Sequence, residues 1–378
     1  MADDYSNFKD IDPNMAFRPA DGDGIAWHLP FEAPMQLNGF AWFNQYHLYH
    51  RLPEEKPEEV TQYPGGKKIT VAAKDCGAFQ LSPHTAGGQI RFRTNSSQFQ
   101  IKGTMLNCGG MDHMAFTGSA GFDLYLNCNG TWKCFGVTRT DHYKQDFSAT
   151  IVSGVTREVR DVIINFPLYN GVTSLAIGLD ADAVLEAPTP FVDERPVVWY
   201  GTSIQQGGCA SRPGMCSSNI LSRMLNREVI NLAFSGSGRG EPEIAKMLAD
   251  IPNPSLYIID YTWNTDPEAL KITLPMLLDI IRAAHPDTPL LLVTPTPGLP
   301  SMDEIPGTRA EDMAAVMLDE AKRRIDAGDK NVYTFDAFHD ALGDDFWEGT
   351  VDLVHLTDLG FYRLSQAMYP VLKTILKQ

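Results

Sequence analysis

A change of rhythm near residue 196 is the strongest constraint on how this chain can fold. After "EAPTPFVDERP", short apolar runs alternate with longer amphipathic segments: "VVWYG", "REVINLAF", "SLYIIDY" and "PLLLVTP" are each followed by a helical pattern of apolar residues. Short apolar strands followed by amphipathic helices predict a parallel sheet covered by helices on both faces. Binding sites in such sheets lie at the carboxyl ends of the strands.

The preceding part of the chain has the period of β-structure. From about Lys68 to Val184 it consists of short runs separated by turn signals, and polar and apolar side chains alternate over residues 89–93. This alternation is typical of a strand with two different faces, and Asn129-Gly130 is a two-residue hairpin signal. We therefore predict an N-terminal β-sandwich or jelly-roll domain with an extended N-terminal segment over residues 1–190, and an α/β domain over residues 191–378.

An acidic charge balance argues against polyanionic partners. The chain has 47 acidic and 31 basic residues and a net charge of -16, which opposes binding to nucleic acid and to anionic membranes. We find no run of the ~18 consecutive apolar residues that a membrane-spanning helix needs. Because the start, "MADDYSNFKD", is acidic and polar, it differs from a secretory signal. We expect a cytoplasmic protein, although a secreted form without its signal would look the same, and an oligomer remains possible.

The cysteines do not indicate a metal or redox site. None of the six forms a CxxC pair or has a His-rich companion spacing, so we expect no metal and no cofactor. Cys128 and Cys134 flank the predicted hairpin turn "NGTWK", where their side chains could meet across two strands. Reduced thiols are expected in a cytoplasmic protein.

Three polar residues follow predicted strands. The run "VVWYGTS" places Ser203 at a strand-to-helix turn, where a nucleophile can be exposed and rigidly held; the alternative is a serine that caps the next helix. In "NLAFSGSGRG", Gly236 belongs to a loop whose backbone N–H groups can approach a ligand, unless the loop is only a glycine-rich turn. Asn264, in "IIDYTWN", could donate a hydrogen bond to an oxyanion or cap a helix.

An acid and a histidine lie close together near the C-terminus. In "VDLVHLTDLG", Asp352 and His355 are three residues apart, which on one helical turn places both side chains on the same face. The carboxylate could then hold one imidazole nitrogen while the other faces a serine hydroxyl. A solvated surface pair would have the same spacing, but the position before the closing helix favours the functional interpretation.

Taken in order, "YGTSIQQGG", "AFSGSG", "DYTWN" and "DLVH" resemble the four sequence blocks of the SGNH (GDSL-like) hydrolase family, over about residues 195–378. The resemblance implies a Ser203 nucleophile with His355 as base and Asp352 as its acid partner. It also implies an oxyanion hole made by Ser203, Gly236 and Asn264. Two positions depart from the family pattern, because Thr202 precedes the serine and Thr262 stands two residues before Asn264.

Both departures resemble a branch of the family whose N-terminal β-domain carries a G-x-D-L-Y motif, present here at residues 121–125. The segment "GGCASRPGM" also resembles that branch and places Arg212 near the mouth of the site. By this resemblance the fold is a flavodoxin-like three-layer α/β/α domain preceded by a jelly-roll-like β-sandwich. Thr202, Arg212 and Trp263 are the expected substrate contacts.

The activity implied by the resemblance is a metal-independent serine esterase. It would remove short acyl groups, with acetyl preferred, from a small or carbohydrate ester through an acyl-enzyme. The alternatives are an acyltransferase that uses the same residues and a carbohydrate-binding protein that has kept a hydrolase fold without catalysis. The presence of all five matched residues, Ser203, Gly236, Asn264, Asp352 and His355, disfavours the binding protein.

Overall fold

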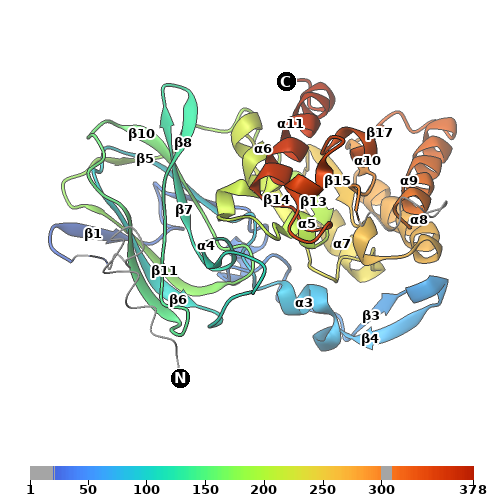
Figure 1. Ribbon diagram of the computed structural model, residues 1–378, viewed down its shortest axis with the longest axis horizontal. Coiled ribbons are helices and arrows are strands. Elements are labelled where there is room, and N and C mark those ends of the chain that lie inside the picture. The colour runs from blue at the N-terminus through green and yellow to red at the C-terminus, as the bar shows by residue number, and fades with distance from the viewer. Residues whose placement is uncertain (1–19, 21, 299–308) are drawn as a thin grey trace.

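The computed structural model describes residues 20, 22–298 and 309–378, and Figure 1 shows them as a β-rich part beside an α/β part. The β-rich part contains two antiparallel sheets with the strand orders β1-β11-β6-β9 and β12-β5-β10-β7-β8, and β2 pairs with β5. The strands of these sheets are β1 (Ile25–His28), β2 (Gln36–Asn38), β5 (Gln89–Thr94), β6 (Phe99–Met105), β7 (Asp123–Cys128), β8 (Thr131–Val137), β9 (Asp146–Val152), β10 (Arg160–Asn165), β11 (Val172–Asp180) and β12 (Leu185–Glu186). Short helices α2 (Phe43–Tyr46) and α4 (Phe116–Ser119) connect them.

One apolar core lies between the two antiparallel sheets. Ile90 and Phe92 of β5 are fully buried in the same cluster as Ile101 of β6 and Ile177 of β11. These residues sit two apart along a strand or opposite one another, so each sheet contributes one apolar face. The predicted β-sandwich is therefore confirmed. Cys128 and Cys134 are both free thiols, because the register pairs Cys128 with Thr131 and Cys134 with Tyr125.

The α/β part is built on a five-stranded parallel sheet with the order β14-β13-β15-β16-β17. Its strands are β13 (Val197–Gly201), β14 (Val229–Ala233), β15 (Leu256–Asp260), β16 (Leu290–Val293) and β17 (Val332–Phe335). Its helices are α5 (Ser203–Gln206), α6 (Ser217–Leu225), α7 (Pro242–Ala249), α8 (Pro267–Ala284), α9 (Arg309–Asp326), α10 (Ala337–Asp340) and α11 (Asp358–Ile375). Counted along the chain this is the 2-1-3-4-5 order of flavodoxin-like folds.

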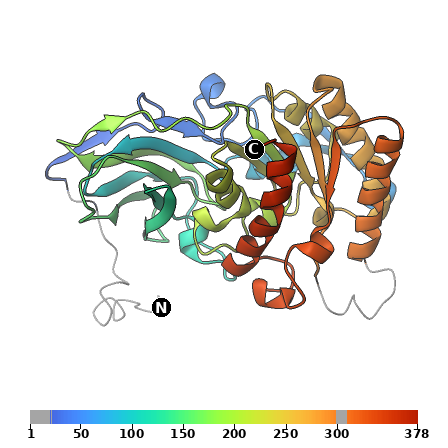
Figure 2. The ribbon, with the colours of Figure 1, turned by 90° about the horizontal axis from the view of Figure 1, so that it is seen from above.

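Helices cover both faces of this sheet, as Figure 2 shows with α11 on one side and α8 and α9 on the other. Along β13, Val198 and Tyr200 pack in the cluster that contains residues of α7, α8 and α9. Val197 and Trp199 pack in the opposite cluster, with residues of α6 and α11. Both faces of the strand are buried, which explains its uninterrupted apolar sequence, and the three-layer arrangement is confirmed.

Residues 49–82, which we call the crossover segment, leave the β-sandwich and pack on the α/β part. They contain β3 (Glu59–Gln62), β4 (Ile69–Ala72) and α3 (Gly77–Leu81), which Figure 1 shows beside α7 and α8. Leu52, Val60 and Phe79 are buried in the core of the α/β part. The strand expected just after Lys68 does form, but it pairs with β3 in a separate ribbon, because alternation within a strand does not specify its partner.

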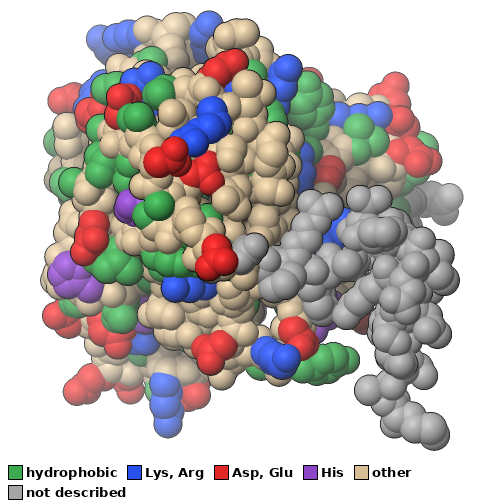
Figure 3. Space-filling model, turned by 90° about the vertical axis from the view of Figure 1, so that its left-hand side faces the viewer, with side chains coloured by type: hydrophobic (Ala, Val, Ile, Leu, Met, Phe, Trp, Pro, Cys, Tyr) green, Lys and Arg blue, Asp and Glu red, His purple; other side chains and the backbone are tan. Residues whose placement is uncertain are grey.

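The outer face of the β-sandwich, seen in Figure 3, carries acidic and basic side chains interspersed with one another. Within residues 22–298 and 309–378, no helix has the length and apolarity needed to cross a membrane.

Candidate functional site

Ser203 is the first residue of α5, directly after the carboxyl end of β13. Thr202 is the residue that caps this helix, because its Oγ1 accepts a hydrogen bond from the Ile204 N–H at 3.3 Å. The Thr202 N–H in turn donates to Gln205 Oε1 at 2.8 Å, which completes a capping box. Ser203 is therefore not the cap, and its N–H is among those at a helix start without an intrahelical acceptor.

A buried polar network supports this turn from below. Gln205 Nε2 donates to Asp260 Oδ2 at 2.6 Å, while Gln205 Oε1 accepts the N–H and hydroxyl of Thr202. Asp260 ends β15 and is only 4% exposed, and this burial raises the pKa of its carboxyl well above the ordinary value. The network links the neighbouring strands β13 and β15 directly beneath Ser203.

His355 and Asp352 complete a hydrogen-bonded chain with Ser203. His355 Nε2 lies 2.9 Å from Ser203 Oγ, and His355 Nδ1 lies 2.7 Å from Asp352 Oδ2. Partial burial tends to raise the pKa of the Asp352 carboxyl, but hydrogen bonds from the backbone and ring of His355 lower it overall. This is the geometry in which a carboxylate orients an imidazole toward a hydroxyl.

The spacing of Asp352 and His355 suggested that they share one turn of a helix. The structure shows that they do not. The segment is a tight loop closed by a bridge between Thr350 and Leu356. Asp352 Oδ1 accepts the N–H groups of Val354 at 3.1 Å and His355 at 2.7 Å. An aspartate that bonds the backbone ahead of it favours a turn over a helix.

Gly236 and Asn264 lie on the loops that follow β14 and β15. Gly236 has a φ of 64°, a left-handed conformation that glycine adopts without steric cost. Asn264 ends the short 3₁₀ helix Thr262–Asn264, and its Nδ2 donates to Phe234 O at 2.9 Å. The second hydrogen on that amide remains for another acceptor. The residue types and loop positions fit donors to an oxyanion.

The sequence comparisons agree with this geometry. Residues 194–373 match the GDSL-like Lipase/Acylhydrolase family, and residues 25–185 match the GxDLY domain, described as the N-terminus of Esterase_SGNH_hydro-type. The chain belongs to the GDSL-like (SGNH) hydrolase family. Its membership, and the presence of the GxDLY domain, confirm the resemblance seen in the sequence. The comparison with curated proteins gave no match.

Solved structures share the fold of this GDSL-like hydrolase over nearly its whole length. A protein of Bacteroides ovatus ATCC 8483 described as a GDSL-like lipase is 28% identical, with a TM-score of 0.79 over 93% of this chain and 98% of that one. The salicylyl-acyltransferase SsfX3 from a tetracycline biosynthetic pathway is 16% identical, with a TM-score of 0.70 over 94% and 98%. A family two carbohydrate esterase from Cellvibrio japonicus is 12% identical, with a TM-score of 0.57 over 93% and 98%.

The GxDLY motif of this hydrolase joins its two parts. Asp123 is fully buried, and its Oδ2 accepts hydrogen bonds from the Gly214 N–H at 2.7 Å and from Arg212 Nη1 at 3.1 Å. Tyr125 accepts a further hydrogen bond from Arg212. A side chain at Gly214 would collide with Tyr125 and Asp123, so the glycine permits this close approach. Arg212 thus lies in the interface between the parts with its side chain partly exposed, and its contact with substrate stays a prediction.

Thr202 and Trp263, the other two expected substrate contacts, differ in their burial. Thr202 is 1% exposed, and its hydroxyl is engaged with Gln205, which gives it a structural role beneath Ser203. Trp263 is half-buried, with its Nε1 3.4 Å from Thr296 Oγ1. It packs against the same core cluster as Leu356, the neighbour of His355. Its position beside the site leaves substrate contact by Trp263 as a prediction.

The N-terminal half reaches the site at two positions that the sequence did not single out. Tyr169 donates from its hydroxyl to Ser203 O at 2.9 Å. The His113 ring lies 5.9 Å from the His355 ring, at 67° to it. Met111 and Met114, on either side of His113, pack against the core that contains α6 and α11. The loop that carries His113 is therefore docked beside His355.

Arg51, in the crossover segment, supports the loop that carries Gly236. It is fully buried, with its guanidinium 4.5 Å from the Phe234 ring centroid. It donates to His84 O at 2.6 Å, to Leu81 O at 3.0 Å and to Ala233 O. Burial lowers the pKa of Arg51 to about 9. These carbonyl oxygens satisfy the buried guanidinium.

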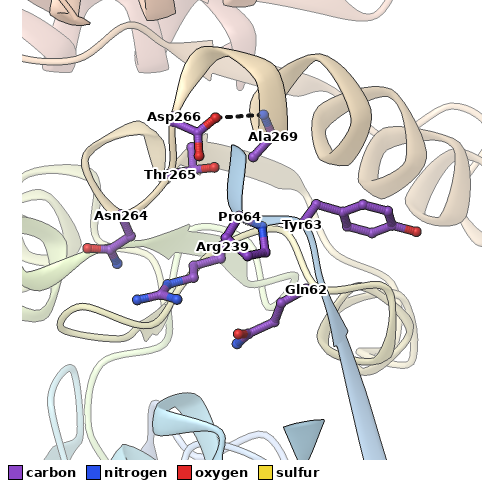
Figure 4. Close-up of a pocket in the computed structure, with 8 residues that line it drawn as sticks. All are labelled: Gln62, Tyr63, Pro64, Arg239, Asn264, Thr265, Asp266 and Ala269. Atoms are coloured by element: carbon purple, nitrogen blue, oxygen red, sulfur yellow. Dashed lines mark hydrogen bonds between the residues drawn. The ribbon is translucent and has the colours of Figure 1, made fainter. Parts of the chain in front are cut away.

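An open pocket of about 460 Å³ adjoins Asn264 (Figure 4). Its walls come from four places: the crossover segment, the loop after β14, the segment after β15, and the start of α8. The lining residues are Gln62, Tyr63, Pro64, Arg239, Asn264, Thr265, Asp266 and Ala269. Among the residues that the structure describes, no three His, Cys, Asp or Glu side chains are grouped as they would be to hold a metal ion.

Proposed function

We propose that this protein is a serine esterase that forms an acyl-enzyme on Ser203. The observation that carries the proposal is the continuous chain of hydrogen bonds, 2.7 Å from Asp352 to His355 and 2.9 Å from His355 to Ser203. Ser203 and His355 are 152 positions apart in the sequence. A nucleophile, a base and an orienting carboxylate in this order are the requirements of acyl transfer.

In the proposed reaction, Ser203 Oγ attacks the ester carbonyl carbon as His355 Nε2 accepts the hydroxyl proton. The carbonyl oxygen becomes an oxyanion, which accepts hydrogen bonds from the Ser203 and Gly236 N–H groups and from Asn264 Nδ2. When the intermediate collapses, the ester C–O bond breaks and His355 gives its proton to the leaving alcohol. A water molecule then attacks the acyl-enzyme by the same steps and releases the acid. One oxyanion donor of this kind contributes roughly 3 kcal/mol in the transition state.

The proposed substrates are carbohydrate or other small esters with a short acyl group. Family two carbohydrate esterases from Cellvibrio japonicus and Clostridium thermocellum, the latter in complex with cellohexaose, share the fold. The second candidate is acyl transfer to an alcohol, since the fold is also shared with a salicylyl-acyltransferase. The two activities differ only in whether water or an alcohol attacks the acyl-enzyme.

The test compares hydrolysis of p-nitrophenyl acetate, butyrate and octanoate by the wild type and by Ser203→Ala. We expect turnover that favours acetate and falls by at least about 10³-fold in the variant. Ser148→Ala, which removes an exposed hydroxyl on β9, is the matched control and should keep wild-type rates. Equal turnover by the wild type and Ser203→Ala would overturn the proposal.

An added alcohol separates the two candidate activities. If the protein transfers acyl groups, a sugar or another polyol will divert the acyl group from water, and a new ester will be detected by mass spectrometry. If it is a hydrolase, free acid will remain the product at every alcohol concentration.

A further inference from the structure

The pocket beside Asn264 is built from the crossover segment and the α/β part. The tip of the β3–β4 ribbon, which belongs to the crossover segment, forms one wall of the pocket (Figure 4). Carboxylates of the α/β part hold this ribbon in place: Glu243 accepts the Thr61 N–H at 3.0 Å, and Asp266 accepts the Gly65 N–H at 2.9 Å. The pocket is thus built by two distant stretches of the chain and has a defined wall on the ribbon side.

The acidic groups at this pocket are already engaged by the protein. The two carboxylate oxygens of Asp266 accept the N–H groups of Ala269 at 3.0 Å and Gly65 at 2.9 Å. Glu241, beneath the pocket, is 1% exposed and accepts hydrogen bonds from Gln62 at 3.2 Å and Tyr200 at 3.0 Å. The Arg239 backbone N–H also donates to Glu241 Oε2, at 3.0 Å.

Arg239 is the cation of this pocket and is exposed to solvent. Its Nη2 donates to Gly236 O at 2.9 Å, so the guanidinium is attached to the same glycine whose N–H is a proposed oxyanion donor. A guanidinium has five N–H donors, and this contact uses one of them. In Figure 4 the Arg239 guanidinium and the Asn264 amide extend toward the same end of the pocket.

We propose that this pocket binds a carboxylate carried by the substrate, that Arg239 is the partner of that carboxylate, and that the natural substrate is therefore an acidic ester. The inference rests on the proposed ester hydrolysis at Ser203 and narrows its substrate class. The Arg239 guanidinium and the one Gln62 amide hydrogen that is not donated to Glu241 offer donors to an anion. A purely aliphatic acyl chain would leave the guanidinium facing apolar groups, and a cationic substrate would be repelled by it.

The carboxylate could belong to the acyl group or to the alcohol, and two pairs of esters, each an acidic ester and a neutral aliphatic one, distinguish these sources. Monomethyl succinate and methyl butyrate differ by a carboxylate on the acyl side. Acetoxyacetate and propyl acetate differ by a carboxylate on the alcohol side. The measured quantity is the ratio of kcat/KM for the acidic ester to kcat/KM for its neutral partner.

We expect the wild type to favour the acidic ester in one of the two pairs. Arg239→Gln should lower that ratio by about 10- to 100-fold, the range for a lost charge-assisted hydrogen bond. Arg239→Lys should retain part of the ratio because the charge remains. Lys271→Gln, which removes a cation of α8 that does not line this pocket, should retain all of it. Any loss through the Gly236 contact affects both esters and cancels in the ratio.

A wild type that shows no preference for the acidic ester in either pair would overturn the inference. So would an Arg239→Gln variant that slows both members of a pair equally, because Arg239 would then only position Gly236. In both cases the neutral esters are still hydrolysed, and hydrolysis still depends on Ser203. If no ester is hydrolysed, or if Ser203→Ala is as active as the wild type, the proposed function itself fails.

Discussion

The two sides of Ser203 are held in different ways. On one side, His355 and Asp352 lie on a loop near the surface, with side chains that are 25% and 43% exposed. On the other side, the loop that carries Gly236 rests on the buried residues Phe234 and Arg51. The proposed acid–base side depends on a few exposed contacts, whereas the loop of the proposed oxyanion side is anchored on the core, with Asn264 half-buried and Gly236 itself exposed. We expect substitutions on the first side to affect activity alone and substitutions on the second to affect both activity and stability.

Asp352→Asn and Asn264→Ala test this contrast most directly. Asp352→Asn should lower kcat on the order of 10⁴-fold, since the imidazole loses the partner that fixes its orientation, with little change in Tm. Asn264→Ala should lower kcat by about 10²- to 10³-fold and also lower the Tm, because Phe234 O loses one of the three hydrogen bonds that it accepts. Steady-state kinetics and thermal unfolding of both variants measure the two effects. A large Tm loss in Asp352→Asn alone would reverse the contrast.

Arg51→Met tests whether the oxyanion side belongs to the core. The substitution removes a donor from three carbonyl oxygens, of which Leu81 O keeps the His84 N–H, and we expect the free energy of unfolding to fall by about 3 kcal/mol. Denaturant unfolding measures this change. Arg157→Met, which breaks the exposed ion pair with Asp182, is the control and should have little effect. If the free energy of unfolding fell by similar amounts in both variants, the buried contacts of Arg51 would contribute no more to stability than an exposed ion pair.

Asp260→Asn tests the network under Ser203 through pH. Because the pKa of Asp260 is raised in the folded state, the folded protein keeps a proton that the unfolded chain releases above about pH 4. Its contribution to stability is therefore complete at low pH and is lost as the pH rises toward the raised pKa. The slope is at most about 1.4 kcal/mol per pH unit.

Asn has no proton to lose, so the variant should lack this part of the pH dependence of unfolding, which in the wild type begins above about pH 4. Asp326→Asn, which changes an exposed carboxylate of α9, should keep the wild-type slope. Identical slopes for the wild type and Asp260→Asn would contradict a proton-bearing Asp260.

His113→Ala should have the smallest effect and sharpens the comparison on the acid–base side. In the proposed mechanism the leaving alcohol must lie within reach of His355, and the His113 ring is docked beside that residue. Loss of one ring contact is worth about 0.5–1.5 kcal/mol, so we expect kcat/KM to change by about 2- to 12-fold. The change should depend on the alcohol of the ester and not on its acyl group. His113→Phe keeps a ring and should retain more of the wild-type rate.

The architecture and the residues proposed for the chemistry could be predicted from the sequence, because the patterns that indicate them lie in neighbouring residues. The strand-to-helix rhythm is a property of adjacent residues, and Ser203, Gly236 and Asn264 each follow a strand end that can be recognised locally. The Asp352–His355 spacing was also informative, although the turn around it is a loop and not a helix.

Arg51 and His113 could not be found in this way. Arg51 bonds Ala233, which is 182 residues away, and His113 meets His355 from the other half of the chain. Neither pairing leaves a pattern in the residues around it. Arg212 shows the same limit of sequence analysis. The segment around it resembles the family, but its hydrogen bond to Asp123, 89 residues away, could not be predicted from the neighbouring residues.

The crossover segment determines which parts of this protein can be transplanted. A fragment that begins at residue 191 would contain Ser203, Asn264 and His355, yet it would lack Leu52, Val60 and Phe79, which fill the core beneath α7 and α8. Such a fragment would expose that core to water. The boundary near residue 191 between the two parts of the sequence therefore does not separate two complete cores. Moving this chemistry into another scaffold requires two non-contiguous stretches of the chain to be moved together.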